Sequence, residues 1–277
     1  MRLGWSSKQS SQRILRVAGT LFLAMLVFYI VVYWYQPFSD SWNNLFANVV
    51  PQAASLVAAI FATLIWNHYD RQDPPRRVWG WFALALWMWF GAEVAWGYLN
   101  ITAGEVALGL PDVLWIASYL FLGLSLIHQF RILAEPGSRV LGTWIAIAAA
   151  ALAGLTVGIH RVITAAAATP PTLDVIVNSF YPAADLVMAV IALWLARNFI
   201  GGAFSRPWIG LLVFSFADLL YAWLEASGAY AWSLEQGNLL TTLADVAYLA
   251  SYLVLGWGVL YMWLFLKYGL LRHTDAR

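Results

Sequence analysis

The residues of this sequence best suited to chemistry are carboxylic acids inside long apolar segments. Glu93, Asp185 and Asp218 lie well within such segments, and Asp245 lies shortly after the start of another. An ionised carboxylate at the centre of a bilayer costs about 2.5–3.5 kcal/mol on insertion scales, so several in one chain need a shared reason. A polar pocket is one such reason, because carboxylates surrounded by Tyr and Trp suit a cationic or polyhydroxy ligand.

Two pairs of related motifs place aromatic residues beside these acids. The segment 112–123, DVLWIASYLFLG, is matched by the segment 245–256, DVAYLASYLVLG, with the same spacing throughout. The segments 92–96, AEVAW, and 217–221, ADLLY, correspond more loosely. The residues predicted to line the pocket come from these motifs and from a Tyr-Pro-x-x-Asp sequence: Glu93, Asp112, Trp115, Tyr119, Tyr181, Asp185, Asp218, Tyr221, Asp245, Tyr248 and Tyr252.

A structural role is the alternative for these acids, each accepting hydrogen bonds from a helix N-terminus or from a neighbouring Tyr, Trp or Ser. This role suits Asp112 and Asp245, which are predicted near helix N-termini, where the helix dipole stabilises a negative charge. Asp185 differs, because Pro182 interrupts its helix one turn earlier and frees a carbonyl in the same region. The sequence leaves both roles open for Asp185 and Asp218.

Three further chemistries are disfavoured by where the basic residues fall. A proton or cation relay would need basic partners, but His160 and Arg161 are predicted close to the membrane interface. A bis-histidine haem is geometrically conceivable for His68 and His128, although both are predicted at helix ends, where exposed histidines are common. A retinal Schiff base needs a lysine deep in a pocket, whereas Lys267 can extend to the interface. We therefore predict no cofactor.

No catalytic or metal-binding motif is present in the sequence. It contains no H-E-x-x-H, G-x-S-x-G or P-loop pattern. The absence of cysteine excludes disulfides, thiol nucleophiles and metal–thiolate sites. Asp185 and Asp218 could imitate an intramembrane aspartyl hydrolase, but the glycine motifs that usually flank such acids are missing. The sequence thus favours a protein that is not an enzyme.

The composition indicates that lipid covers much of this protein. Hydrophobic residues make up 62% of the 277 residues and charged residues only 10%, with a mean hydropathy of +0.71. An average soluble domain has about 25% charged residues. The few basic residues form no stripe that would suit nucleic acid. We therefore predict an all-α integral membrane protein with lipid as its main surroundings.

Eight apolar segments are each long enough to cross a bilayer as a helix, which takes about 20 residues. Pro, Gly, Asn and charged residues separate them. The first follows a basic N-terminus and is too long for the core of a cleaved signal peptide, so we expect it to be retained. The predicted spans are 14–35, 45–66, 78–99, 113–133, 140–162, 175–196, 208–227 and 240–266.

The distribution of basic residues predicts the orientation of these spans. Among the basic residues, only Arg161 falls on the outer side if the N-terminus is cytoplasmic, in agreement with the positive-inside rule. Both termini are therefore predicted in the cytoplasm. The basic residues predicted on the cytoplasmic side are Arg2, Lys8, Arg13, Arg16, Arg71, Arg76, Arg77, Arg131, Arg139, Arg197, Arg206, Lys267, Arg272 and Arg277.

The repeated motifs predict an internal duplication within a single membrane domain, residues 1–277. Repeat 1 spans about 14–133 and repeat 2 about 140–266, and Pro51 and Pro182 form a further, weaker match. Four helices per repeat keep both halves in the same orientation, which gives parallel repeats related by an axis along the membrane normal. Ligand sites in such proteins often lie where the halves meet.

The motifs PDVLWIASYLFLGLSL, FYPAADLVMAVIALWLAR, FSFADLLYAW and GNLLTTLADVAYLASYLVLGWG resemble the N-terminal membrane modules of some bacterial GGDEF diguanylate cyclases. The resemblance covers roughly residues 78–265. It implies a sensory module in the inner membrane of a bacterium. No GGDEF domain follows Leu266 in this sequence, so we expect no cyclase activity from it. The positions that match are Asp112, Trp115, Tyr119, Tyr181, Pro182, Asp185, Asp218, Tyr221, Asp245, Tyr248 and Tyr252.

The sequence therefore favours a membrane sensory or ligand-binding module with an acidic, aromatic pocket that opens outward. It would act through a membrane or cytoplasmic signalling partner, and its ligand would be small and polar or cationic. Two alternatives stay open, an accessory structural subunit of a larger membrane complex and a small transporter. Transport is disfavoured because the half of the membrane nearest the cytoplasm is almost free of polar residues in the sequence.

Overall fold

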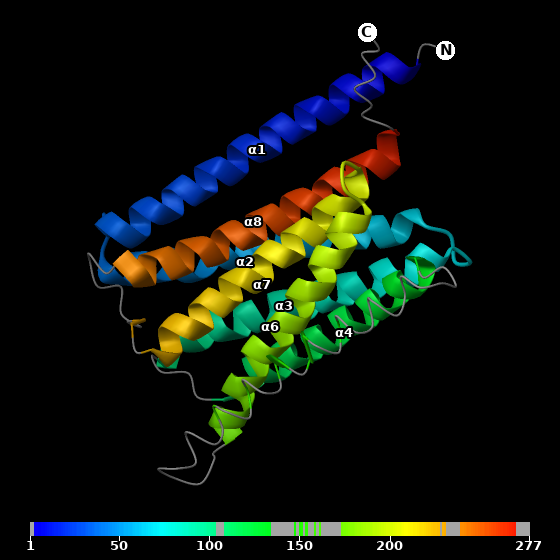
Figure 1. Cartoon of the computed structure of the whole chain (residues 1–277). Helices are drawn as coiled ribbons and strands as arrows, with labels where there is room; N and C mark the ends of the chain where they lie inside the picture. Colours follow the sequence, from blue (N-terminus) through cyan, green and yellow to red (C-terminus); the bar gives the residue numbers. More distant parts are fainter. Residues whose placement is uncertain are drawn as a thin grey trace.

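Long helices form the whole of the described structure, and they lie side by side in one bundle (Figure 1). The computed structural model describes residues 3–103, 108–133, 173–227, 229–230 and 239–269, together with isolated positions between 147 and 161. The elements in chain order are α1 (Leu3–Tyr35), α2 (Asp40–His68), α3 (Pro74–Ala103), α4 (Leu110–Leu133), α6 (Leu173–Asn198), the short 3-10 helix η1 (Ala203–Ser205), α7 (Arg206–Ala226) and α8 (Leu239–Tyr268).

Within these described residues, seven helices are long and apolar enough to cross a membrane. The prediction of an all-α, multi-pass membrane protein is confirmed at this level. The predicted span 140–162 lies outside the described residues, apart from isolated positions. The seven segments are Ser10–Tyr35, Asp40–His68, Pro74–Thr102, Leu110–Leu133, Ile176–Asn198, Ala203–Glu225 and Leu239–Tyr268.

Several helices extend beyond the spans predicted from hydropathy. The helix predicted at 45–66 begins at Asp40, and the helix predicted at 78–99 continues to Ala103. Polar residues occupy these extra turns, so an apolar window does not include them. The extension matters for the site, because Asn44 and Asn100 lie outside the predicted spans but within α2 and α3, which define their positions.

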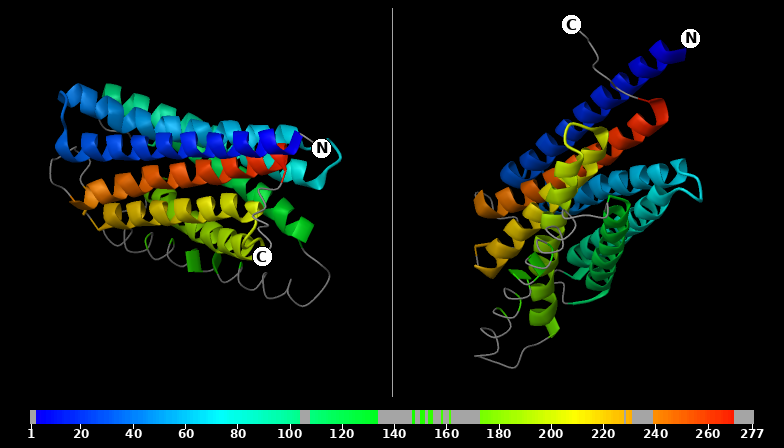
Figure 2. Two further views of the ribbon diagram at one scale, coloured as in Figure 1. Left: turned by 90° about the horizontal axis from the view of Figure 1, so that it is seen from above. Right: turned by 45° about the vertical axis from the view of Figure 1, so that its right-hand side comes forward.

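Helices α2, α3, α7 and α8 form the centre of the bundle. Helix α8 lies between α1, α2 and α7, helix α3 packs on α2 and α4, and α6 packs on α7 (Figure 2). The side of α8 that faces α2 is closely packed, because Gly256 and Ala58 bring the two helices together. By contrast, α6 approaches α4 at only a few positions. Small residues such as Gly256 and Ala58 at a close helix contact are typical of helices that pack in membranes.

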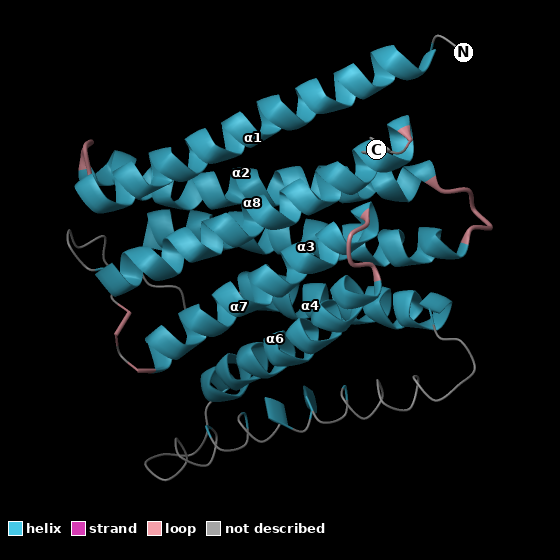
Figure 3. Cartoon of the chain, turned by 45° about the horizontal axis from the view of Figure 1, so that its top comes forward, coloured by secondary structure: helices cyan, strands magenta, loops and turns pink. Residues whose placement is uncertain are grey.

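The helices alternate in direction, which gives the bundle two distinct ends. Helix α1 begins at the end where α2, α4, α6 and α8 finish (Figure 3). We call this end the basic end, because it collects Arg71, Arg76, Arg77, Arg131, Arg197, Arg206 and Lys267 at helix termini. Helices α4 and α6 run in the same direction, so the end of α4 and the beginning of α6 lie at opposite ends of the bundle (Figure 1).

Candidate ligand-binding site

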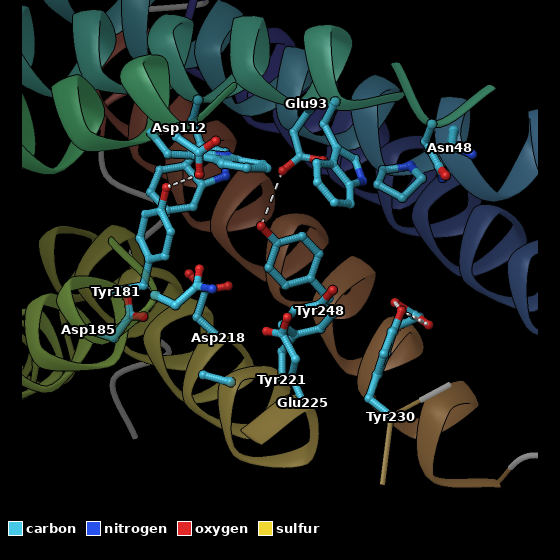
Figure 4. A pocket seen from close by; sticks show the side chains of 18 of the residues that line it. Asn48, Glu93, Asp112, Tyr181, Asp185, Asp218, Tyr221, Glu225, Tyr230 and Tyr248 are labelled. Carbon is cyan, nitrogen blue, oxygen red and sulfur yellow. Dashed lines mark hydrogen bonds between the residues drawn. The ribbon is translucent and has the colours of Figure 1, made fainter. Parts of the chain in front are cut away.

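A cavity of about 680 Å³ occupies the half of the bundle away from the basic end. All seven long described helices contribute to its wall. Figure 4 shows the acidic and tyrosine side chains that point into it. The lining residues are Tyr29, Tyr33, Asn44, Ala47, Asn48, Pro51, Trp89, Glu93, Trp96, Asn100, Leu108, Asp112, Trp115, Tyr119, Arg161, Asn178, Tyr181, Asp185, Asp218, Tyr221, Ala222, Glu225, Tyr230, Asp245 and Tyr248.

The predicted pocket residues all lie at this cavity. Each of them except Tyr252 lines it, and Tyr252 lies behind the wall with its hydroxyl on the Glu93 carboxylate. Residues from the two motifs 112–123 and 245–256 are therefore brought together from α4 and α8. The sequence does not show such convergence, because helix spacing gives the face of each helix and not its neighbours.

Two prolines expose backbone at the cavity. Pro51 in α2 and Pro182 in α6 lie inside their helices and lack the N–H that would bond the carbonyl four residues earlier. Those carbonyls belong to Ala47 and Asn178, and both residues line the cavity. Both freed carbonyls therefore belong to residues of the cavity wall.

Glu93 is buried and well supplied with hydrogen-bond donors. Its Oε1 accepts from the hydroxyl of Tyr252 at 2.7 Å and from that of Tyr248 at 3.2 Å. The Tyr252 oxygen in turn accepts from the indole N–H of Trp89 at 2.6 Å. Glu93 Oε1 therefore has two hydroxyl donors from the protein itself. This arrangement fits a structural role for Glu93.

Asp112 and Asp245 also have protein donors. Asp112 accepts from the Tyr181 hydroxyl at 2.8 Å and from the backbone N–H of Gly109 at 2.9 Å, beside the N-terminus of α4. Both oxygens of Asp245 lie 3.0 Å from the Tyr230 hydroxyl. Tyr230 lies in the connection before α8, where burial and the charge of Asp245 raise its pKa, so it stays a donor. The structural role predicted for these two acids agrees with these contacts.

Asp185 and Asp218 share a single donor between them. The Tyr119 hydroxyl lies 2.7 Å from Asp185 Oδ1 and 3.2 Å from Asp218 Oδ2. Asp185 is 1% exposed, and its Oδ2 has no hydrogen-bond partner among the described residues. Figure 4 shows the two carboxyl groups close together on α6 and α7. We call them the Asp185–Asp218 pair.

The hydrogen count around this pair is incomplete. A tyrosine hydroxyl has one proton to donate, so it can satisfy only one of two carboxylates. A buried acceptor without a donor costs free energy, and more when it is charged. A proton or a ligand cation between the carboxyl groups would supply what is missing. The pair is therefore chemically different from Glu93, Asp112 and Asp245.

The cavity wall is strongly acidic. Arg161 is the one basic side chain among the described lining residues, and it donates to the backbone oxygen of Ala222 at 3.4 Å. The described residues contain no cluster of three or more His, Cys, Asp or Glu that could hold a metal ion. The carboxylic acids that line the cavity are Glu93, Asp112, Asp185, Asp218, Glu225 and Asp245.

No family model matches this chain, and no curated protein or solved structure matches it. The chemistry of the site therefore rests on the geometry of its own residues.

Some lining residues were not predicted from the sequence. Asn44, Asn48 and Asn100 form a small amide network in which Asn48 accepts from Asn100 at 3.2 Å and donates to Asn44 at 2.9 Å. Asn44 and Asn100 lie just outside the predicted spans 45–66 and 78–99. The sequence does contain a signal for them: Asn44 and Asn48 are four residues apart, so the two polar side chains lie on the same face of one helix.

Proposed function

We propose that this protein is a membrane-embedded binding module whose cavity takes a small organic cation from the outer side of the membrane. The Asp185–Asp218 pair is its anchor. The observation that carries this proposal is the shared hydroxyl of Tyr119, which leaves one carboxyl group without a donor. A cation that enters this site gains both charge pairing and hydrogen bonds in a region of low dielectric constant.

The direction of helices supports eight crossings with both termini in the cytoplasm. Helix α4 finishes at the basic end and α6 begins at the opposite end, so the connection between them joins opposite ends of the bundle. We propose that the predicted span 140–162 makes that crossing. The positive-inside rule then places the basic end in the cytoplasm and the cavity on the outer side.

Reciprocal hydrogen bonds support the 4+4 repeat. In the repeated motifs Tyr119 corresponds to Tyr252, and Glu93 corresponds to Asp218. Tyr119 of the first half contacts Asp218 of the second, and Tyr252 of the second half contacts Glu93 of the first. Such an exchange is expected where two parallel repeats meet around an axis along the membrane normal.

Departures from this symmetry favour the Asp185–Asp218 pair as the binding site. The position that corresponds to Asp185, counted from the matched prolines, is Ala54 in α2, which is buried against neighbouring helices. Trp89, which donates to Tyr252, is replaced by Phe214 at the corresponding position. Compared with the surroundings of Glu93, those of Asp218 therefore contain one more acid, Asp185, and lack the indole donor that Trp89 provides.

A sensory role is favoured over transport by the packing below the cavity. Trp79, Phe82 and Trp208 are nearly fully buried and pack ring against ring toward the basic end. Together with Leu122 and Leu211 they belong to the buried core of the bundle and do not line the cavity. Such packing suits a receptor module, in keeping with the resemblance to the membrane modules of diguanylate cyclases, and signalling would pass to a partner protein.

Thermal unfolding of the detergent-solubilised protein tests the binding proposal. We expect ethanolamine, putrescine or choline at millimolar concentration to raise the unfolding temperature, while glucose does not. A ligand at a free concentration of 100 times its Kd raises the free energy of unfolding by about 2.7 kcal/mol. The stabilisation should be lost in Asp185→Asn.

Asp245→Asn is the matched control, because it removes another lining acid whose partner is a protein hydroxyl. This variant should keep the cation-dependent shift even if its own unfolding temperature falls. Equal shifts in the wild type and in Asp185→Asn, or no shift with any of these cations, would contradict the proposed function.

A further inference from the structure

We infer that the ligand carries a primary ammonium group, which docks between Asp185 and Asp218. This inference rests on the proposed function and narrows it from organic cations in general to primary amines. It follows from the number and kind of polar atoms at the pair, and it makes a prediction that separates primary amines from quaternary ones.

The pair presents acceptors that need hydrogen atoms as well as positive charge. Asp185 Oδ2 is buried and has no donor within hydrogen-bond distance among the described residues. Asp185 Oδ1 and Asp218 Oδ2 compete for the one proton of Tyr119. When that proton goes to one carboxylate, the other still lacks a donor. The site is therefore short of N–H or O–H groups.

A primary ammonium group meets this shortage directly. It has three N–H donors and a full positive charge, like the lysine side chain. Asp185 and Asp218 both line the cavity, so a primary ammonium group bound there would supply N–H donors to the pair. Charge-assisted hydrogen bonds of this kind are about twice as strong as neutral ones.

A quaternary ammonium group carries the same charge but has no N–H. Its methyl groups would hold the carboxylates at a distance and leave Asp185 Oδ2 without a donor. Cation–π attraction alone would favour such a ligand, because Tyr119, Tyr181 and Phe180 pack ring against ring beside the pair. The unpartnered carboxylate oxygen decides between the two, since an unmet buried acceptor costs more than a lost aromatic contact.

A second unpartnered group lies one helical turn from Tyr119. The indole nitrogen of Trp115 is buried and lies near the Glu93 carboxylate, but it makes no hydrogen bond of standard geometry among the described residues. Trp115 and Tyr119 are four residues apart on α4 and so share a face, and both line the cavity. The rings of Trp115 and Tyr181 lie 6.3 Å apart, centre to centre. An oxygen on the carbon chain next to the amine would accept from this indole, so amino alcohols fit the site well.

The test compares ligands that differ only in methylation of the nitrogen. Ethanolamine and choline form one matched pair, and propylamine and trimethylpropylammonium form another. Binding to the full-length solubilised protein is measured by isothermal titration calorimetry, with thermal unfolding as a second readout. We expect the primary amine of each pair to bind at least tenfold more tightly. Equal or tighter binding of the quaternary member would overturn the inference.

The outcomes separate this inference from the proposed function. If choline and ethanolamine bind equally and both are lost in Asp185→Asn, the pocket binds cations but does not select primary amines. If no amine binds, both proposals fail. Asp218→Asn serves as a second variant in case Asp185→Asn does not fold, and it should likewise reduce the preference for ethanolamine over choline.

Discussion

Tyr119 and Tyr252 occupy the same place in a repeated motif, yet the acids they contact differ in how well they are satisfied. Tyr252 accepts from Trp89 and donates to Glu93, and Tyr248 supplies a second donor. Tyr119 has two carboxyl groups to serve and one proton. Burial alone does not distinguish a structural acid from a functional one, because Glu93 and Asp185 are both almost fully buried. The count of donors and acceptors does.

Removing the hydroxyl of Tyr252 should destabilise the protein. In Tyr252→Phe, Glu93 loses its shorter hydrogen bond and the indole of Trp89 loses its acceptor. Buried polar groups left unpaired cost about 1–3 kcal/mol each. We expect the free energy of unfolding in detergent to fall by about that amount, with cation binding kept. Tyr119→Phe should lower stability as well, because it removes the donor to the buried Asp185, but unlike Tyr252→Phe it should also alter ethanolamine binding.

Trp115→Phe tests the oxygen acceptor proposed on the ligand. Phenylalanine keeps an aromatic ring against Tyr181 but removes the unpartnered indole N–H. We expect weaker binding of ethanolamine and unchanged binding of ethylamine, which has no hydroxyl to accept from the indole. Calorimetric titration of both amines into the wild type and the variant measures this difference. An equal loss for the two amines would show that Trp115 acts only through packing.

At the residue scale, the sequence indicates which residue types could form a site, but it does not indicate their hydrogen-bond partners. The acids and tyrosines could be found because a carboxylate in an apolar segment is costly and therefore informative. Their division into satisfied and unsatisfied groups could not be found, since it depends on which helices are neighbours. Asn44 and Asn100 are not predicted because a hydropathy window ends before the helices do.

At the scale of helices, glycine decides how closely α7 and α8 approach. A β-carbon at Gly258 would lie 2.5 Å from the backbone oxygen of Arg206, and one at Gly210 would lie 2.6 Å from the Cα of Leu255. At distances this short, no side chain fits at Gly258 or Gly210 unless the two helices move apart. Close approach through glycine is typical of helix pairs in membranes, where backbone contact replaces the hydrophobic effect as a driving force.

Gly258→Ala should therefore push α7 and α8 apart. We expect the free energy of unfolding to fall by about 1–3 kcal/mol, as for other overpacked cores. Gly123→Ala is the matched control, because no described atom lies within 4 Å of a β-carbon built there. This control should be neutral or slightly stabilising, since alanine favours a helix over glycine by about 1 kcal/mol. Comparable losses in the two variants would argue against the α7–α8 packing.

The asymmetry between the halves is also a property of helices. Gly123 and Gly256 correspond in the repeated motif, but only Gly256 faces a neighbouring helix closely among the described residues. It lies against Ala58 of α2, whereas α6 approaches α4 at few positions. The spans were predictable because hydropathy marks the centre of each helix. Which interfaces are tight was not, because both halves carry the same small residues.

At the scale of the whole molecule, basic and acidic side chains lie in opposite halves of the bundle. Basic side chains gather at helix termini at one end of the bundle, while the acids line a cavity in the other half. The positive-inside rule therefore predicts that the cavity faces outward. A cavity in that half of the bundle is compatible with the binding module proposed above.

Single-cysteine labelling tests the orientation, and the protein is well suited to it because it contains no cysteine. Ser39 and Gln72 are exposed residues in connections at opposite ends of the bundle. A membrane-impermeant maleimide should label Ser39→Cys in intact cells and Gln72→Cys only after the membrane is opened. The reverse pattern would show that the cavity faces the cytoplasm.

The same labelling tests the eighth crossing. Helices α4 and α6 are parallel, so we predict that the segment between them crosses from the end that carries Gln72 to the end that carries Ser39. Gly137→Cys should thus label like Gln72→Cys, and Ala168→Cys like Ser39→Cys. Labelling of Gly137→Cys and Ala168→Cys from the same side would mean that this segment does not cross. The two halves would then be inverted relative to each other, and the reciprocal contacts of Tyr119 and Tyr252 could not reflect parallel repeats.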